Sequence, residues 1–447
     1  MRTFHLNWLP LLLLPALVPA AAQTAGTPLE LSLKHAIEIA LAPDGNARVQ
    51  IARQMIRQAQ ERANQARATL LPNLDASVSQ QNQTRNLAAF GIRIEAPIPG
   101  FRIPELVGPF NTFDARATAT QTIFDFGAIR RYQASRAGIG AAGAENDATR
   151  DQVALQVAGL YFASLRAEAR VQAAEANVKL AEELLQLAEN QKTAGTGTGL
   201  EITRAQVQLA NERQLLLVAR NERRQANLQL LKAMGLPLVT PLLFSYQLAR
   251  VPVEETTPEK ALAVALESRA DLKAQRQREE SARLSYSGAK MERLPSVVGF
   301  ADYGTIGTSI HNTVPTRTYG LSVRVPVFDG GRRDARRAES GSLFEQEKIR
   351  TADLKRQIDL ELRLSLDSLR SAEEQVNVAE DGLKQAEDEL ARASRRYKAG
   401  VANSLEVTDA QTRLARARDN RISALYLYNQ ARVELGQALG TIQQMVD

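Results

Sequence analysis

Glu406 and Asp409 stand three positions apart in the segment 397–411, which reads YKAGVANSLEVTDAQ. Residues with this spacing share one face of a helix, so the two carboxylates can act together on a cation or a proton. A similar segment, KTAGTGTGLEITRAQ, occupies 192–206 and carries Arg204 where the later segment has Asp409. The two segments therefore share a pattern but differ in the sign of the charge at this position.

A simpler role, helix capping, also fits the glutamates of both segments. Asn403 precedes Glu406 by three residues and Thr198 precedes Glu201 by three, which is the spacing of a capping box. We expect Glu201 to be a cap. For Glu406, capping and a position facing a pore are both open alternatives. Asp409 lies beyond the reach of the box, so capping explains it less well.

Other reactive side chains are scarce. The chain has no cysteine and three histidines, of which His35 and His311 lie outside the N-terminal leader. These counts exclude thiol nucleophiles and argue against a histidine-rich metal site. The glycines at 195, 197 and 199 lack the Lys-Ser/Thr pair of a P-loop. We therefore expect no enzyme activity, no cofactor and no metal site, with a carboxylate-based hydrolase as a remote alternative.

The first 22 residues are typical of a secretory signal peptide. Arg2 precedes an apolar run from Leu9 to Val18, and three alanines at 20–22 provide a cleavage site before Gln23. No other segment approaches the length of a membrane-spanning helix. The absence of cysteine excludes a lipid-anchored N-terminus, and interspersed charges argue against a nucleic-acid partner.

An internal repeat organises the rest of the chain. A shift of 205 positions places Gly195 on Gly400 and Gly235 on Gly440. The same shift relates two heptad seams of apolar and small residues, which predict long helices packed as coiled coils. Residues 129–190 alone would form a helix about 93 Å long. The seam residues are Val153, Val157, Leu160, Ser164, Ala167, Val171, Ala174, Val178, Ala181, Leu185 and Ala188, and their counterparts Ile358, Leu362, Ser365, Leu369, Ala372, Val376, Ala379, Leu383, Ala386, Leu390 and Ala393.

Strand-like segments precede each long helix. Apolar and polar residues alternate clearly at 318–327 and more weakly at 113–124, which predicts a strand in each range. Each of these strands is preceded by another, which begins after a Leu-Pro step, at 294–295 or at 71–72. We expect two hairpins, at about 72–124 and 295–328, and a Pro-rich loop at 86–111. The predicted domains are a signal peptide (1–22), a first repeat (23–236, helix pair 128–234), a linker (237–257) and a second repeat (258–447, helix pair 331–440).

Four strands of membrane-spanning length cannot close a barrel, because an open edge is not tolerated in lipid. Either the hairpins form a soluble sheet, or several chains pool their strands, and three chains would supply twelve. A secreted or periplasmic coiled-coil structural protein or adhesin without a channel is the alternative. It explains the heptads but not the duplicated tip or the two hairpins.

The chain resembles the TolC-like outer-membrane efflux factors over essentially its whole mature length. The resemblance rests on LSLKHAIEIAL near the N-terminus, the two Leu-Pro steps, FDFG and FDGG after the strands, YKAGVANSLEVTDAQ and the duplicated architecture. It implies a mostly α fold with a small β part. Long antiparallel coiled-coil helices would form a periplasmic α-barrel, and three chains would share a 12-stranded transmembrane β-barrel in the outer-membrane lipid.

The same resemblance implies a function and partners. The homotrimer would be the outer-membrane exit duct of a tripartite efflux or type I secretion system, supplied by an inner-membrane pump through a periplasmic adaptor. Conduction would be passive, through an acidic periplasmic gate that opens like an iris. The adaptor would contact the two helical tips, at Ala194, Gly195, Thr196, Leu200, Ala399, Gly400, Val401 and Leu405.

Within that family pattern the gate maps onto Glu406, Asp409 and Tyr397, with Arg204 beside them. Two departures concern how the gate is held closed: this chain has Ala402 where an arginine is found in the family, and Arg204 where an aspartate is found. We expect Arg204 to replace the missing link by pairing with one of the two acids. Four arginines after FDGG are either an interfacial charge belt below the barrel or a solvated helix face: Arg332, Arg333, Arg336 and Arg337.

Overall fold

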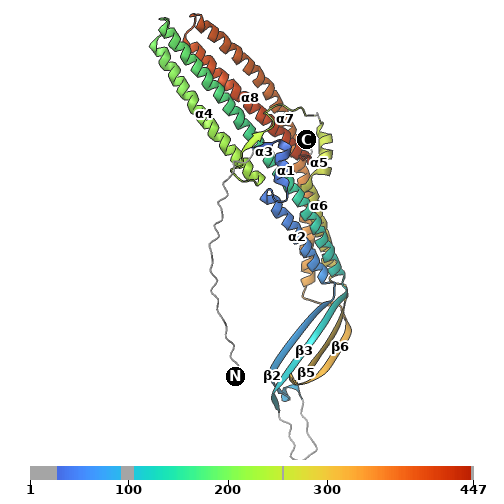
Figure 1. The fold of residues 1–447 in the computed structure, drawn as a ribbon. Helices are drawn as coiled ribbons and strands as arrows, with labels where there is room; N and C mark the ends of the chain where they lie inside the picture. Colours follow the sequence, from blue (N-terminus) through green and yellow to red (C-terminus); the bar gives the residue numbers. More distant parts are fainter. Residues whose placement is uncertain (1–27, 92–104, 254–255, 444–447) are drawn as a thin grey trace, which may run out of the picture.

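A computed structural model describes residues 28–91, 105–253 and 256–443, so the predicted signal peptide lies outside the described residues. The molecule is elongated, with long helices at one end and a β-sheet at the other (Figure 1). This confirms the predicted mostly α fold with a small β part. Among the described residues, no helix has both the length and the apolar composition that crossing a bilayer requires.

Four helices form the long part of the molecule: α3 (Phe126–Thr193), α4 (Gly199–Met234), α7 (Arg332–Lys398) and α8 (Ser404–Leu439). With 68 residues, α3 is about 100 Å long. Every predicted seam position is buried or half-buried. The heptad pattern therefore identifies the faces along which these helices pack.

Ion pairs join neighbouring helices on their exposed sides. Each pair is solvent-exposed and stabilises the fold by well under 1 kcal/mol, about the value of surface pairs in general. Because the pairs occur at three successive levels of α3 and α4, they favour one axial register of the two helices over shifted ones. The α3–α4 pairs are Glu182–Arg213 at 2.9 Å, Glu175–Arg220 at 2.9 Å and Glu168–Arg223 at 3.3 Å.

The sheet has four antiparallel strands in the order β2-β3-β5-β6. Their bounds are Asn73–Asn86, Leu106–Phe124, Ser296–Ser309 and Asn312–Arg324. Strand β3 begins at Leu106, so the prediction that 86–111 is loop throughout is wrong in its last residues; residues 92–104 lie outside the described part. Strands β2 and β6 each have one edge without a partner strand among the residues that the structure describes.

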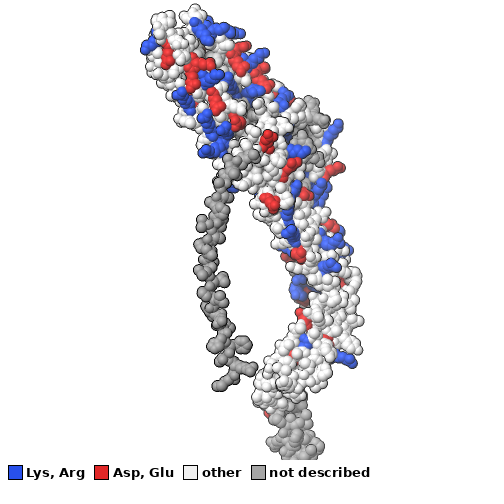
Figure 2. Space-filling view, viewed as in Figure 1, with Lys and Arg blue, Asp and Glu red and all other residues white. Residues whose placement is uncertain are grey.

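The two faces of the sheet differ in polarity. One row across the four strands is Leu74, Ala119, Ala301 and Tyr319, and the next row, on the opposite face, is Asp75, Thr118, Asp302 and Thr318. Leu74 and Tyr319 are 75% and 79% exposed. Figure 2 shows that charges of both signs cover the helices and that the sheet carries few in this view.

An ion cluster lies on the polar face of the sheet. The guanidinium of Arg116 donates to both carboxylate oxygens of Asp114 at 2.8 and 2.6 Å and lies 3.4 Å from an oxygen of Asp302. The cluster joins β3 to β5 across the boundary between the two hairpins. The polar face therefore holds specific charge contacts, whereas the apolar face is exposed in the single chain.

Shorter elements lie between the helical tips and the sheet: β1 (Leu29–Leu31), α1 (Leu33–Leu41), α2 (Ala47–Ala68), β4 (Leu242–Phe244), α5 (Pro258–Ser268) and α6 (Ala270–Met291). The 3-10 helix η1 (Ala88–Phe90) lies apart from them, in the connection from β2 to β3. Strands β1 and β4 pair in parallel, which the sequence did not predict. The largest buried apolar cluster lies here, and the hydroxyl of Tyr161 on α3 donates to the carbonyl of Leu31 at 3.2 Å.

The internal repeat is visible in the element lengths. Helices α4 and α8 have 36 residues each and begin 205 positions apart. For the elements that precede the hairpin turns, the offset between the two repeats is 223 residues. Helices α2 and α6 (22 residues each) begin 223 positions apart, and so do strands β2 and β5 (14 residues each). The offset changes because residues 87–105 connect β2 to β3, whereas only Ile310 and His311 connect β5 to β6.

Candidate functional site

The two helical tips have the same backbone geometry. Gly195 and Gly400 adopt left-handed φ values of 75° and 73°, which glycine adopts without strain. In the first tip the amide of Thr196 donates to the carbonyl of Gln191 at 3.0 Å, and in the second that of Val401 donates to Arg396 at 3.1 Å. Each helix end is thus closed by the same pair of turns, 205 residues apart.

The tips expose apolar side chains as well as backbone. Leu200, Val401 and Leu405 are between 54% and 67% exposed. A Cβ added at Gly195 or Gly400 would meet no atom within 4 Å, so each glycine is required by its φ and not by close packing. Both tips therefore present a small, partly apolar surface that a partner could cover.

The glutamates at the start of α4 and α8 make different contacts. The carboxylate of Glu201 accepts from the amide of Thr198 at 3.0 Å, which completes the predicted capping box. At the second tip Asn403 accepts from the amide of Glu406 at 3.1 Å, but the carboxylate of Glu406 pairs with Arg396 at 3.0 Å. Asn403 is thus the cap of α8, and Glu406 uses its charge across the α7–α8 turn.

Tyr397 lies at the end of α7 with 4% of its surface exposed. Its ring packs in an apolar cluster with Ala393, Val407 and Ala410, and its hydroxyl has no hydrogen-bond partner among the described residues. Burial raises the pKa of the Tyr397 hydroxyl, and the charge of Glu201 raises it further. The tyrosine predicted to be part of the gate is therefore a neutral, buried group beside a carboxylate from the other repeat.

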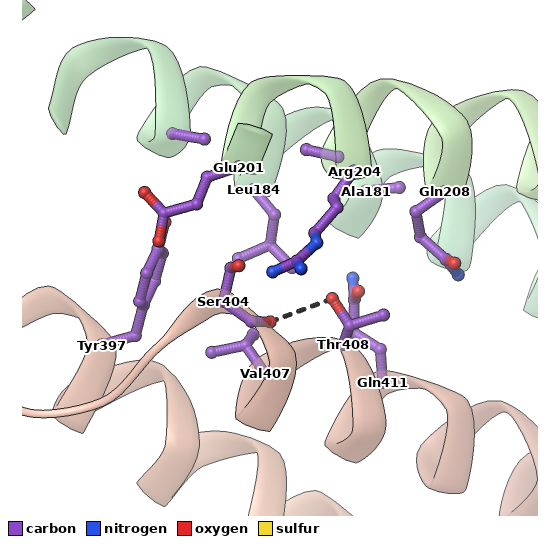
Figure 3. A pocket seen from close by; sticks show the side chains of 12 residues that line it. Ala181, Leu184, Glu201, Arg204, Gln208, Tyr397, Ser404, Val407, Thr408 and Gln411 are labelled. Carbon is purple, nitrogen blue, oxygen red and sulfur yellow. Dashed lines mark hydrogen bonds between the residues drawn. The ribbon is translucent and has the colours of Figure 1, made fainter. Parts of the chain in front are cut away.

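A cavity of about 20 Å³, large enough for roughly one water molecule, separates the two repeats at this point. Figure 3 shows Glu201 reaching from α4 towards Tyr397, and Arg204 towards Ser404 and Thr408 at the start of α8. The hydroxyl of Ser404 is also buried and has no hydrogen-bond partner among the described residues. The cavity lining is Ala181, Leu184, Ala188, Glu201, Arg204, Ala205, Gln208, Tyr397, Ser404, Val407, Thr408 and Gln411.

The structure brings together only part of the predicted gate. Tyr397 and Arg204 line the cavity, whereas Glu406 and Asp409 do not. Among the described residues Arg204 forms no ion pair with either acid: Glu406 is paired with Arg396, and Asp409 is exposed and does not line the cavity that Arg204 faces. The expected link from Arg204 to one of these acids is therefore not made within one chain.

Two residues of this region were not expected from the sequence. Glu201 was interpreted only as a cap, yet it lies one helical turn before Arg204 on the same face and also lines the cavity. Arg396 pairs with Glu406 and directly precedes Tyr397. The charge of Arg396 beside the candidate tyrosine was a signal that could have drawn attention to it.

Comparison with protein families matches 39–236 and 261–441 of this chain to the outer membrane efflux protein family. The chain is 25% identical over 395 residues to the pyoverdine export outer membrane protein OpmQ of Pseudomonas putida, covering 86% of this chain and 81% of OpmQ. It is 23% identical over 348 residues to the alkaline protease secretion protein AprF of Pseudomonas aeruginosa, covering 75% of this chain and 71% of AprF.

The fold matches a solved channel over nearly its full length. The outer membrane channel CmeC of Campylobacter jejuni superposes with a TM-score of 0.78 at 17% identity, covering 92% of this chain and 86% of CmeC. At this identity the likeness concerns the fold, which includes both long helix pairs and the sheet. Together with the family match over most of its length, this shows that the chain belongs to the outer membrane efflux protein family and is located in the outer membrane.

Proposed function

We propose that three copies of this chain form a passive exit duct of a tripartite efflux or type I secretion system. The sheets would pool into a 12-stranded barrel in the outer membrane, and the long helices would form a tunnel through the periplasm. Family membership supports this proposal, as do the relatives named for pyoverdine export and for alkaline protease secretion.

The observation that carries the proposal is that two features of the sheet require a further molecule: its unpaired edges and its exposed apolar face. Strands β2 and β6 are its edges, and one face is apolar and exposed. In lipid, the main-chain groups of an open edge would each cost several kcal/mol, about the value for any unpaired backbone group in hydrocarbon. Pairing β2 of one copy with β6 of the next satisfies both edges and leaves the apolar face towards lipid.

In this proposal the periplasmic adaptor docks on the two helical tips. The predicted adaptor-contacting residues lie on or beside the two glycine turns, and several are exposed. An adaptor that binds the opened tips more tightly than the closed ones would shift the duct towards its open state. An inner-membrane pump would supply the energy, since conduction through the duct is passive.

The gate in this proposal consists of the two acids, Glu406 and Asp409, and of the residues at the contact between the two repeats. Three copies of Glu406 and Asp409 would place six carboxylates around a narrow neck, which favours cations. Tyr397 and Arg204 would lie behind that neck, in the small cavity between repeats. Outward movement of α7 and α8 would separate the walls of the cavity and widen the neck.

Planar-bilayer recording of the purified full chain tests this function. The wild type is expected to conduct and to prefer cations, and Glu406→Ala with Asp409→Ala is expected to lose most of that preference. The matched control removes two other exposed acids, Glu183→Ala on α3 with Asp388→Ala on α7, and should keep the wild-type reversal potential.

Two results would contradict the proposal at different levels. Conduction with unchanged selectivity in the double variant would reject the acidic gate. Absence of the protein from the outer-membrane fraction, together with absence of conduction, would reject the duct and favour the coiled-coil adhesin.

A further inference from the structure

Basic residues are concentrated where the helices meet the sheet. We define the junction layer as residues 62–71, 124–137, 286–294 and 325–338, which flank the four connections between helices and strands. It holds eleven basic and four acidic residues, a net charge of +7, whereas the whole chain has a net charge of +6. The rest of the chain is thus close to neutral, and the excess of positive over negative charge is confined to one level of the molecule.

The four acids of the junction layer are all paired with arginine. Glu292 lies 3.2 Å from Arg131 and 2.9 Å from Arg336, and Asp329 lies 3.0 Å from Arg333. Asp125 and Asp334 pair with Arg131 and Arg293 in the same way. Six basic residues of the layer have no carboxylate partner in the described part of the chain, and all but Arg130 are exposed: Arg62, Arg67, Arg130, Arg136, Lys290 and Arg337.

Exposed apolar residues occupy the part of the junction layer that adjoins the sheet. Val327 and Phe328, between β6 and α7, are 94% and 88% exposed. Other connections contribute Leu71, Leu294 and the edge-to-face pair Phe124–Phe126, with ring centroids 4.2 Å apart. Along the long axis the surface therefore changes from the apolar sheet face, through apolar and aromatic residues, to unpaired guanidinium groups.

This order matches the layers of a lipid leaflet: hydrocarbon, interface and phosphate. We infer that the junction layer binds the phosphate groups of anionic phospholipids in the leaflet from which the helices emerge. The inference rests on the proposed function, because it requires the sheet to span the membrane. Arginine suits this ligand because its guanidinium donates two parallel hydrogen bonds to phosphate oxygens.

A second copy of the chain cannot neutralise this charge. In a ring of identical copies around one axis, each copy presents its own junction layer at the same level, with the same excess of +7. Association therefore adds positive charge at that level, and the counter-charge must come from another molecule.

The test uses the full-length protein in detergent, titrated with phosphatidylglycerol or phosphatidylcholine, with bound lipids counted by native mass spectrometry. Wild type is expected to retain phosphatidylglycerol in preference to phosphatidylcholine, and to lose this preference as salt rises from 0.1 to 0.5 M. The variant Arg62→Gln/Arg67→Gln/Arg136→Gln removes three exposed arginines that make no ion pair in the described structure. Retention should fall by about fivefold for each arginine removed.

Two matched variants complete the design. Arg224→Gln/Arg392→Gln/Arg395→Gln makes the same charge change in α4 and α7, outside the junction layer, and should bind lipid as wild type does. The variant Arg62→Lys/Arg67→Lys/Arg136→Lys keeps the three charges and should keep most of the preference. Equal binding of the two lipids by wild type, or a junction variant that retains phosphatidylglycerol as wild type does, would overturn the inference. If the protein reaches the outer membrane and conducts, such a result leaves the proposed duct intact.

Discussion

Matching residues of the two tips have diverged in their contacts. Glu201 and Glu406 are related by the repeat, yet Glu201 folds back onto the amide of Thr198 while Glu406 pairs with Arg396. The counterpart of Arg396 in the first tip is Gln191, which carries no charge. The arginine in place of this glutamine gives the second carboxylate a charged partner that the first one lacks.

The Glu406–Arg396 pair gives a prediction for selectivity. Both side chains are about half exposed, so the pair is worth at most about 1 kcal/mol. Arg396→Ala should free the carboxylate at the neck and raise the cation-to-anion permeability ratio by up to about fivefold, the factor equivalent to that energy. Arg392→Ala removes an exposed arginine one turn earlier and is the control. A ratio no higher in Arg396→Ala than in Arg392→Ala would contradict a pore-facing Glu406.

Residue-level prediction succeeded where backbone geometry decides the outcome. The left-handed glycines and the Thr198–Glu201 box follow from local chemistry, so the turn and the first cap could be predicted. The partner of Glu406 could not, because that side chain must choose between its own cap and a group across the turn. The half-buried position of Glu201 beside Tyr397 depends on how the two repeats pack, which no local pattern specifies.

At the scale of elements, two glycines with similar backbone angles differ in their surroundings. Gly235 ends α4 with φ 77°, and a Cβ there would lie 2.6 Å from the carbonyl oxygen of Gly45. Gly400 has φ 73° but open space around it. The first glycine is required by both conformation and packing, and the second by conformation alone.

Alanine at these two positions should separate the two effects. Gly400→Ala is expected to lower the free energy of unfolding by about 1–2 kcal/mol, the cost of the left-handed conformation for an L-residue. Gly235→Ala should lower it by clearly more, because the turn that contains Gly45 must also move away from the end of α4. Denaturant unfolding followed by circular dichroism measures both variants. Equal losses would show that the contact between Gly235 and Gly45 is unimportant.

Tyr161 on α3 is hydrogen-bonded to Leu31 of β1, and its hydroxyl predicts that the free energy of unfolding depends on pH. Burial raises the pKa of its hydroxyl from 10 to about 12. Below pH 10 both folded and unfolded states keep the proton; between pH 10 and 12 only the unfolded state loses it. The stability contributed by this protonated hydroxyl should therefore be complete below pH 10 and should fall by about 2 kcal/mol by pH 12.

The comparison of wild type with Tyr161→Phe isolates this effect from the other groups that titrate in the same range. The variant loses the hydrogen bond to Leu31, so it should be less stable than wild type at pH 9. The difference in the free energy of unfolding should shrink as the pH rises to 12. A difference that is constant with pH would mean that the Tyr161 hydroxyl is not held neutral by the fold.

Elements were predictable in proportion to their length. The long helices repeat one apolar pattern many times, and the strands of the second hairpin alternate clearly. The parallel pair β1–β4 has three residues per strand and forms only because distant segments meet beside α3. The start of β3 at Leu106 was missed because prolines and glycines in 86–111 are typical of a loop.

At the scale of the whole molecule, a single chain is incomplete. The sheet has two open edges, and exposed apolar residues lie along helices as well as strands, including Leu217 and Val378. The sequence predicts that strands must be pooled, but strand length alone does not specify how many chains do so. The number three comes from the family resemblance, and the central claim is that the assembled chains enclose one continuous duct.

The absence of cysteine from the chain allows a direct test of this claim. Asp409→Cys places the only thiol at the proposed neck, and planar-bilayer current is recorded before and after a charged thiol reagent is added to one side. A continuous duct predicts a fall in current when the reagent is added from either side, and no fall for Glu183→Cys, the exposed control. A conducting channel whose current is unchanged by modification of Asp409→Cys would contradict a duct that passes through the neck.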